Sequence, residues 1–396
     1  MGALDGIRVL DLGLLVQGPQ AAAMLGDLGA DVIKVELPGI GDQARWIGVE
    51  LPADWRPPYF IANNRGKRSV TLDLRTAGGA AAFTRLVASA DVMISNFKPG
   101  TLEGWGLGYD DLAPDNPRLV YATGSAFGPV GPDAEREGAD LAGQAAGGLI
   151  ATTGTDDGEP SPVGATISDH IASQNMVAGI LASLFHRERT GLGQRVDVSL
   201  VGGQIYAQAA EYTAYFLNGR QPGRSNHGHP LLPFIYGIFP TSDGWIAMIG
   251  VPAHLKDAFF ETIGRPDLGA DPRYGAPFLT PDDRRDLFAL LRDIFRTSTT
   301  ADWLARLRHA GQRVAPVRDY AAVTADPQVL ANGYIVPAGD PSSPTELMIG
   351  SPIRLSATPA EPSSTVAELG QHTEEVLLEI GCTWDDIERF RADGAY

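Results

Sequence analysis

An aspartate at the start of a predicted helix is the first residue whose position suits chemistry. Between Asp169 and Arg187, apolar side chains recur at the spacing of a helix with one buried face. Backbone amides and the helix dipole favour the ionised form of a carboxylate at such a helix start, which keeps it ready as a nucleophile. The same position also suits an ordinary N-cap. The local sequence leaves both interpretations open.

Basic side chains gather in the N-terminal quarter of the chain. The first hundred residues hold ten acidic and ten basic side chains, so the whole net charge of −17 belongs to the remainder. The bases in question include Lys34, Arg45, Arg65, Lys67, Arg68, Arg75 and Lys98. This density suits the phosphates of a small anionic ligand, although a solvated loop balanced by nearby acids explains it equally well. The acidic chain as a whole argues against nucleic acid as a partner, because like charges repel.

Several common catalytic signatures are missing. The turn after the first predicted strand, residues 12–18, lacks G-x-G-x-x-G, and the chain has no P-loop, no G-x-S-x-G elbow and no H-E-x-x-H pair. The sequence therefore argues against an enzyme that uses nicotinamide, a nucleoside triphosphate, a nucleophilic serine or zinc. His227 and His229 lie close together, but no third ligand is placed beside them, and we expect no metal site.

Three features indicate a cytoplasmic protein. A single cysteine, Cys382, cannot form an intrachain disulfide, and the first residues lack the layout of a signal peptide. No uncharged apolar run approaches the roughly 20 residues that cross a bilayer. We therefore expect no membrane association.

The order of predicted elements favours an α/β fold with an open, mostly parallel sheet. Strands are predicted at 8–12, 31–36, 69–74, 91–95, 119–123 and 195–200, and helices at 17–29, 77–89, 169–187 and 203–217. Strands that alternate with helices are typical of doubly wound, Rossmann-like domains. Ligands of such sheets bind beyond the carboxyl ends of the strands.

The pattern changes near residue 225. A hairpin is predicted from strands at 236–241 and 245–249, and helices follow at 253–263, 281–295 and 301–310. We therefore expect residues 1–224 to form the first part of a large α/β domain and residues 225–325 to form a smaller inserted α+β domain. Residues 326–396 are expected to return to the large domain.

Seven segments in order resemble the class III CoA-transferases, the CaiB/BaiF superfamily that includes formyl-CoA transferases and acyl-CoA racemases. The segments are 4–12, 26–36 with Gly41, Asp42 and Arg45, 64–74, 96–100, 325–329, 350–354 and 369–373. The resemblance implies a large domain whose sheet is formed by both chain ends, a small inserted domain, and an interlocked homodimer. It implies no permanently bound cofactor, with coenzyme A and acyl-CoA as substrates.

The resemblance also implies a catalytic role for Asp169, at the end of Gly-Ala-Thr-Ile-Ser-Asp. In these enzymes an aspartate attacks an acyl-CoA thioester, and CoA passes through an aspartyl anhydride and an aspartyl-CoA thioester to a second carboxylic acid. Gln17 matches a residue near the reacting centre, where its amide hydrogen-bonds an acyl oxygen or carboxylate. Without the resemblance, Gln17 is only a polar residue that starts a helix.

Contacts to CoA carry over from the family to a set of residues in the N-terminal region. These are Val16, Leu72, Arg75, Asn96, Phe97 and Thr101. Arg45 is expected to contact the nucleotide or to pair with Asp42. Gly104 stands where many relatives carry an arginine, so we expect Lys98 or Arg75 to supply that phosphate contact. Residues 225–231 are expected to cover the site and exclude water, because both intermediates hydrolyse readily.

Ala139 separates the possible functions. Racemases of this superfamily carry a catalytic histidine at this position, and alanine cannot move a proton. An acyl-CoA:carboxylate CoA-transferase is therefore the leading hypothesis. A racemase-like isomerase and a catalytically inactive CoA-binding homologue are the alternatives.

Overall fold

The computed structural model describes residues 1–47, 57–155, 158–224, 228–229, 231–232, 235–274 and 279–396. Contacts divide these residues into two compact units. Unit 1 comprises Met1–Gly147, Gly164–Ala207 and Pro327–Tyr396, and unit 2 comprises Gly148–Val163 and Gln208–Asp326. Residues 148–163 and 208–224, which the sequence placed with the large domain, thus group with unit 2.

A parallel sheet forms the centre of unit 1. Among the described residues it has six strands in the order β3-β2-β1-β4-β5-β6. The strands are β1 (Arg8–Asp11), β2 (Asp31–Glu36), β3 (Arg68–Thr71), β4 (Val92–Ser95), β5 (Val120–Ser125) and β6 (Arg195–Ser199). The strand order reverses between β1 and β4, and ligands of doubly wound sheets bind at the carboxyl ends of the strands beside such a reversal. The predicted α/β fold is confirmed.

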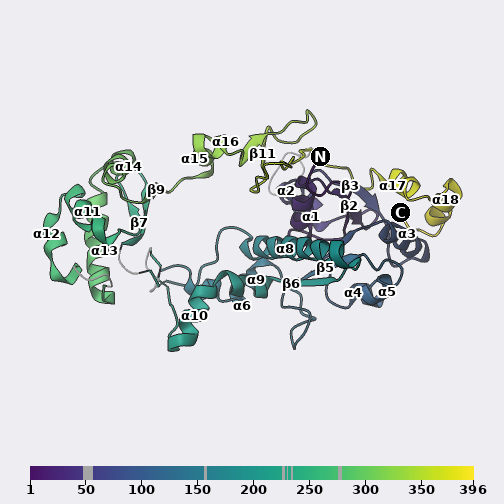
Figure 1. The fold of residues 1–396 in the computed structure, drawn as a ribbon, viewed down its shortest axis with the longest axis horizontal. Coiled ribbons are helices and arrows are strands. Elements are labelled where there is room, and N and C mark those ends of the chain that lie inside the picture. The colour runs from purple at the N-terminus through teal and green to yellow at the C-terminus, as the bar shows by residue number, and fades with distance from the viewer. Residues whose placement is uncertain (48–56, 156–157, 225–227, 230, 233–234, 275–278) are drawn as a thin grey trace. The chain divides into compact units, whose positions relative to one another are not determined.

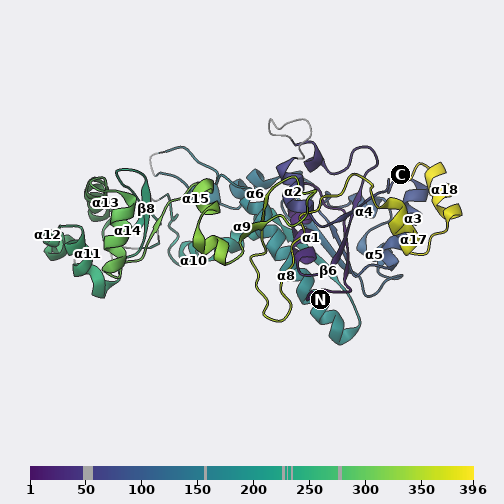
Figure 2. The same cartoon turned by 90° about the horizontal axis from the view of Figure 1, so that it is seen from above.

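Alternation along the strands gives the sheet two apolar faces. On β1, Val9 faces helices α1 and α8, whereas Leu10 faces helices α3, α17 and α18. Figure 1 and Figure 2 show α8 alongside α1 on one face. Both faces are therefore buried, as parallel sheets require.

Helices and short strands complete unit 1. Its helices are α1 (Gln17–Asp27), η1 (Gln43–Arg45), α2 (Pro58–Asn64), α3 (Ala77–Ala88), α4 (Thr101–Gly104), α5 (Tyr109–Leu112), α6 (Asp140–Ala146), α8 (Ile167–Thr190), α9 (Leu200–Ala207), α16 (Pro327–Ala331), α17 (Thr373–Glu379) and α18 (Trp384–Ala392). A separate antiparallel pair consists of β10 (Ile335–Pro337) and β11 (Leu347–Ile349).

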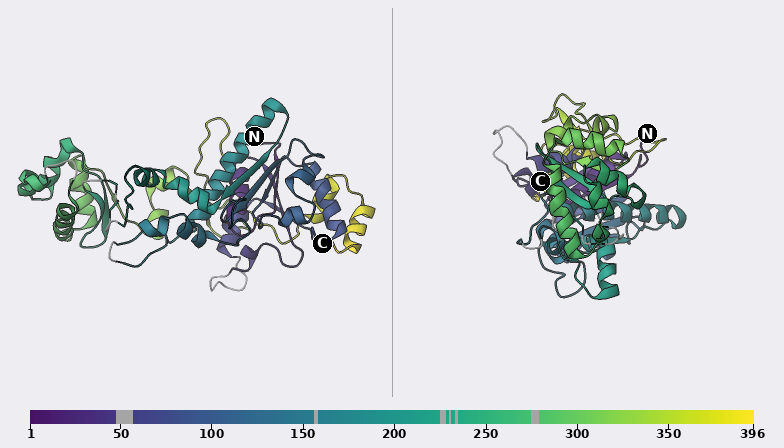
Figure 3. Two further views of the ribbon diagram at one scale, coloured as in Figure 1. Left: turned by 90° about the horizontal axis from the view of Figure 1, so that it is seen from below. Right: turned by 90° about the vertical axis from the view of Figure 1, so that its left-hand side faces the viewer.

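The C-terminal segment covers the edge strand β3 without adding a strand to the sheet. The Thr71 amide donates to Thr373 Oγ1 at 3.0 Å, and the His372 amide donates to the Ser69 carbonyl at 2.9 Å. Figure 3, left panel, shows the yellow C-terminal helices beside the sheet. The prediction that both chain ends form the sheet is therefore wrong: all described strands of this sheet lie between residues 8 and 199. Side chains and irregular backbone satisfy much of the edge instead.

Unit 2 contains a small antiparallel sheet with helices packed on it. The described strands are β7 (Tyr236–Pro240), β8 (Trp245–Ile249) and β9 (Val314–Pro316), in the order β7-β8-β9. The helices are α7 (Leu149–Thr152), α10 (Ala209–Asn218), η2 (Ala253–Leu255), α11 (Lys256–Thr262), α12 (Pro266–Ala270), η3 (Pro272–Tyr274), α13 (Pro281–Phe295), α14 (Thr300–His309) and α15 (Tyr320–Thr324). Phe239, Phe295 and Trp303 stack in its core with ring centroids 5.1–5.3 Å apart. In the described parts of both units, no helix has the length and apolarity needed to cross a membrane.

Candidate active site

The loop between β1 and α1 is held in a fixed conformation at the carboxyl end of β1. Leu15 adopts φ 64°, which costs free energy for a residue with a side chain. Two hydrogen bonds hold the strained segment: the Leu14 amide donates to Asn96 Oδ1 at 2.7 Å, and the Leu15 amide donates to Asp42 Oδ1 at 2.9 Å. Asn96 also donates to the Leu14 carbonyl at 2.8 Å. The loop thus presents Val16 and Gln17 in one defined orientation.

A buried cluster of charged side chains forms hydrogen bonds to the backbone of this loop. Lys34 Nζ lies 2.9 Å from an Asp42 carboxylate oxygen and donates to the Gly13 carbonyl at 2.7 Å. Lys67 Nζ lies 2.6 Å from Asp11 Oδ2. Burial disfavours the charge of Lys34, but attraction to Asp11, Asp42 and Glu36 outweighs it and raises the pKa of Lys34 to about 12. Lys34 and Lys67 therefore act inside the fold rather than as ligands for external anions.

Gln17 is the first residue of α1, and its side chain is buried against the end of β5. Its Nε2 donates weakly to the Ser125 carbonyl at 3.4 Å. Its Oε1 lies over Gly124 so closely that a Cβ at residue 124 would come within 2.3 Å. Gly124 therefore leaves the space that the Gln17 amide occupies.

Asp169 lies in the first turn of α8, partly buried. The carboxylate that caps this helix belongs to Asp140, which accepts from the Ser168 amide at 2.7 Å and from the Asp169 amide at 3.4 Å. Burial, together with the charge of Asp140, raises the pKa of Asp169 to about 7. The prediction that the helix start keeps Asp169 ionised at neutral pH is therefore wrong. The amides that were expected to favour its anion are occupied by Asp140.

The first turn of α8 is joined directly to the start of α1. Ser173 Oγ lies 2.8 Å from the Gln17 carbonyl oxygen and 2.7 Å from the Asp169 carbonyl oxygen. The backbones of Asp169 and Gln17, the two residues predicted to be catalytic, thus lie close together on either side of one hydroxyl group.

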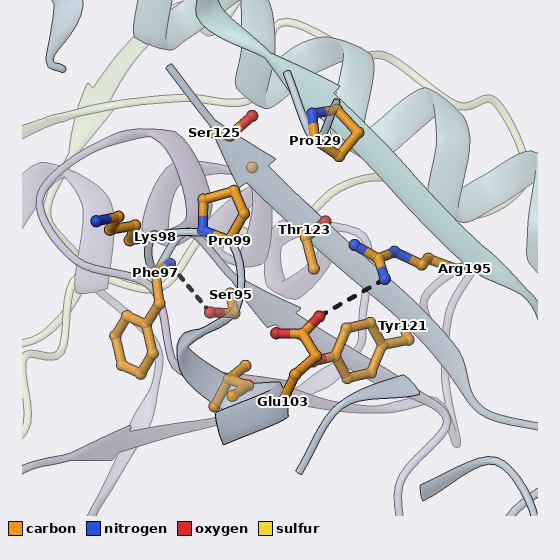
Figure 4. A pocket seen from close by; sticks show the side chains of 12 residues that line it. Ser95, Phe97, Lys98, Pro99, Glu103, Tyr121, Thr123, Ser125, Pro129 and Arg195 are labelled. Atoms are coloured by element: carbon orange, nitrogen blue, oxygen red, sulfur yellow. Dashed lines mark hydrogen bonds and ion pairs between the residues drawn. The ribbon is translucent and has the colours of Figure 1, made fainter. Parts of the chain in front are cut away.

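A pocket lies beyond the carboxyl ends of β4 and β5 (Figure 4). Its lining includes Phe97 and Lys98, which were predicted to contact CoA, and also Gly124 and Ser125 beside Gln17. Arg195 reaches in from β6 and pairs with Glu103 at 3.6 Å and with Asp197 at 3.0 Å. The pocket thus combines an aromatic ring with charges of both signs.

The other predicted CoA contacts fall in different surroundings. Thr101 begins α4, directly before the pocket residue Leu102. Arg75 is exposed and pairs with Asp73 at 2.7 Å. Val16 and Leu72 are buried, and Leu72 belongs to the apolar core beneath the sheet.

Arg45 is engaged inside the fold rather than turned toward solvent. Its Nε donates to Glu36 Oε1 at 2.8 Å and its Nη2 donates to Glu36 Oε2 at 2.9 Å. The guanidinium lies 3.8 Å from the centre of the Phe60 ring. The predicted alternative of a pair with Asp42 is wrong, because Asp42 is taken by Lys34.

The predicted covering loop lies largely outside the described residues, which omit 225–227 and 230. Of its described part, His229 Nε2 lies 3.1 Å from Glu211 Oε1 on α10. Arg284 donates to the His229 carbonyl at 3.2 Å.

Sequence reasoning missed Asp140, Ser173 and Arg195. Asp140 and Arg195 carry no local signal, since their contacts join segments far apart in the chain. Lys34 did carry one: a lysine between apolar residues in the middle of an interior strand requires a buried partner.

Comparison with known proteins identifies the family to which this fold belongs. The family model for CoA-transferase family III matches residues 4–373. The chain belongs to CoA-transferase family III.

Relatives and structures of CoA-transferase family III resemble the chain over nearly its whole length. It is 36% identical to the succinyl-CoA–D-citramalate CoA-transferase of Chloroflexus aurantiacus, over 98% of this chain and 97% of that protein. It is also 36% identical to the succinyl-CoA:mesaconate CoA-transferase of Haloarcula hispanica, over 96% and 97%. A crystal structure of a CaiB/BaiF family protein from Brucella suis superposes with a TM-score of 0.85 at 34% identity, over 96% of this chain and 99% of that one.

Proposed function

We propose that this chain moves coenzyme A from an acyl-CoA donor to a free carboxylic acid through covalent intermediates on Asp169. One observation carries the proposal: Ser173 Oγ lies within hydrogen-bond distance of the main-chain carbonyls of both Asp169 and Gln17, which brings these two residues close together in a chain of CoA-transferase family III. Among the described residues no cation pairs with the Asp169 carboxylate and it does not cap α8, so its oxygens remain available as nucleophiles.

The proposed sequence balances without an external reagent. An Asp169 carboxylate oxygen attacks the thioester carbon, the carbon–sulfur bond breaks, and CoA thiolate leaves a mixed anhydride. The thiolate then attacks the Asp169 carbonyl carbon and releases the donor acid, which leaves an aspartyl-CoA thioester. An oxygen of the acceptor carboxylate attacks the aspartyl thioester carbon, the carbon–sulfur bond breaks, and CoA thiolate leaves a second mixed anhydride. The thiolate then attacks the acceptor's carbonyl carbon of this anhydride and forms the acceptor acyl-CoA, with Asp169 as the leaving group. Asp169 is regenerated as a carboxylate.

The surroundings of Asp169 set the pH at which this sequence begins. Because the pKa of Asp169 is about 7, only part of the enzyme carries the nucleophilic carboxylate at neutral pH. Gln17 supports the reaction by offering its amide N–H to the acyl oxygen as negative charge develops there. Its long contact to the Ser125 carbonyl, at 3.4 Å, leaves that donor easily diverted to a substrate.

Phe97 and Lys98 mark the pocket in which we propose that the CoA chain lies, with Arg195 as an additional cation. The charge of Lys98 is exposed and suits a phosphate, whereas Arg195 is shared with Glu103 and Asp197. For the acids themselves, the succinyl-CoA donors and dicarboxylate acceptors named for two relatives are the first candidates.

The test is to trap the intermediate on the protein. After incubation with succinyl-CoA, hydroxylamine should convert Asp169 to its hydroxamate, which is located by mass spectrometry of peptides. Asp169→Asn should abolish labelling and transfer. The exposed acid Asp110, in the first turn of α5, supplies the control Asp110→Asn, which should retain both. Labelling at another residue, or transfer by Asp169→Asn, contradicts the proposal.

The same preparation distinguishes the alternatives. Ala139, at the start of α6, offers no proton carrier. If the protein instead exchanged the α-proton of an acyl-CoA in D₂O without any acceptor acid, an isomerase would replace the transferase. If it bound CoA tightly without turnover across donors and acceptors, an inactive homologue would replace it.

We also propose the homodimer that the family resemblance implies. Phe216 and Leu217 on α10 are 74% and 82% exposed in the single chain, which is unfavourable for large apolar side chains. Light scattering should give twice the mass of one chain, and a monomer at micromolar concentration contradicts this proposal.

A further inference from the structure

Ser173 contacts the main chain of both residues proposed to be catalytic, but it takes no part in the proposed chemical steps. It lies one turn after Asp169 in α8 and is fully buried. Its hydroxyl has one proton and two carbonyl oxygens within reach, that of Asp169 in its own helix and that of Gln17 in α1. The hydroxyl therefore fastens the turn that carries Asp169 to the residue that carries the amide.

A second contact runs parallel to the first. His170 Nδ1 lies 2.7 Å from Gln20 Oε1, and its Nε2 lies 3.2 Å from Thr166 Oγ1. Gln17 and Gln20 are three residues apart on α1, as His170 and Ser173 are on α8, so each pair shares one helix face. His170 and Ser173 on α8 thus each contact α1, through Gln20 and Gln17 respectively.

The bond from Ser173 to α1 is not required to satisfy the backbone carbonyls that it contacts. Both carbonyls lie in the first turn of a helix, where each has an intrahelical amide partner and a second lone pair to spare. Ser183, further along α8, shows what the fold alone requires. It is also fully buried and donates to the carbonyl four residues back at 2.8 Å, but in the described structure it has no bond to α1. Its remaining partner is Gln194, which donates to it at 2.8 Å.

We propose that Ser173 is a positioning residue for CoA transfer, which fixes the Asp169 carboxylate relative to the Gln17 amide. This inference rests on the proposed function and adds the device that sets its geometry. Without the hydroxyl, the first turn of α8 is free to shift against α1. A displacement of about 1 Å between reacting groups can lower a rate by as much as about 100-fold, while one lost hydrogen bond costs only about 1 kcal/mol of stability.

The test compares Ser173→Ala with Ser183→Ala. We expect kcat for transfer to fall about tenfold in Ser173→Ala, with the donor KM within twofold of wild type. The fraction of acyl-CoA lost to water should rise, because a misplaced aspartyl thioester waits longer for its acceptor. Ser183→Ala should keep kcat and the hydrolysis fraction within about twofold of wild type, since it perturbs the same helix away from the site.

A second variant keeps the test decisive if Ser173→Ala folds poorly. Gln20→Met removes the neighbouring contact at a half-buried position and should change kcat and hydrolysis in the same direction. Equal kcat and hydrolysis in Ser173→Ala and Ser183→Ala would overturn the inference, as would an unchanged Gln20→Met if Ser173→Ala does not fold. If the wild-type protein transfers CoA but the variants do not differ in kcat or in the hydrolysis fraction, the positioning role of Ser173 is contradicted and the proposed function stands. If wild type forms no Asp169 adduct, the proposed function and this inference both fail.

Discussion

Replacing Asp169 by asparagine should stabilise the protein increasingly as the pH rises. The pKa of Asp169 is about 7 in the folded chain, against an ordinary value of 3.8. Between these values the folded state holds a proton that the unfolded state has released, so the free energy of unfolding falls as the pH rises. The neutral asparagine does not incur this loss. The advantage of Asp169→Asn should therefore grow from under about 1 kcal/mol at pH 4 to about 2 kcal/mol at pH 5.5 and about 4 kcal/mol at pH 8.

Urea denaturation followed by circular dichroism at these three pH values measures the difference. Any constant effect of the amide group cancels, because only the change with pH is used. Asp110→Asn, which removes an exposed carboxylate in the first turn of another helix, should show no such trend. A difference that is flat with pH, or that grows as the solution is acidified, would refute the reasoning that burial and Asp140 hold Asp169 protonated.

Three further changes probe the same structure. Asp140→Asn should lower the pKa of Asp169 and move the rise of acyl-CoA labelling, expected near pH 7 in wild type, to lower pH; a pH series of hydroxamate formation measures it. Arg45→Met should destabilise the protein by about 3 kcal/mol in urea, because the buried Glu36 carboxylate loses its ion pair with Arg45 and keeps only hydrogen bonds from the Ser69 hydroxyl and the Asp42 amide. Gly124→Ala should lower kcat about tenfold with little loss of stability, because the added Cβ displaces the flexible end of Gln17; steady-state kinetics and a melting curve check it.

Each of these changes has a matched control. Arg75→Met removes an exposed arginine paired with Asp73 and should leave stability nearly unchanged. Gly339→Ala adds a methyl group where no atom lies within 4 Å, and it should leave kcat unchanged. Asp110→Asn should leave the labelling profile where it is in wild type. A control that behaves like its partner variant contradicts the corresponding prediction.

Strong local periodicity made much of the fold predictable. The predicted helix at 281–295 has the bounds of α13, and the hairpin of β7 and β8 lies where its turn residues indicated. The helix predicted at 203–217 is instead divided at Gln208 into α9 and α10. No glycine or proline marks that break, so local sequence carries no signal for it.

The candidate site was less predictable, because its chemistry depends on distant segments. The position of Asp169 could be read from the chain, but its protonation could not. Asp140 takes the helix amides from 29 residues away, and burial then reverses the direction of the expected pKa shift. Arg45 likewise looked like a ligand-binding cation, and only the packing of Glu36 and Phe60 around it shows a structural role.

The contacts on β3 also bear on how the protein is made. Ser69 receives its partner His372 from 303 positions further along the chain, and just beyond the strand the Asp73 amide donates to the Ala395 carbonyl. While the chain emerges from the ribosome, this edge has a ladder of amides and carbonyls but no cover. Contacts between such remote segments form late and slow folding. A nascent or truncated chain that ends before residue 365 therefore offers an open strand to its neighbours, and it is at this stage that aggregation should begin.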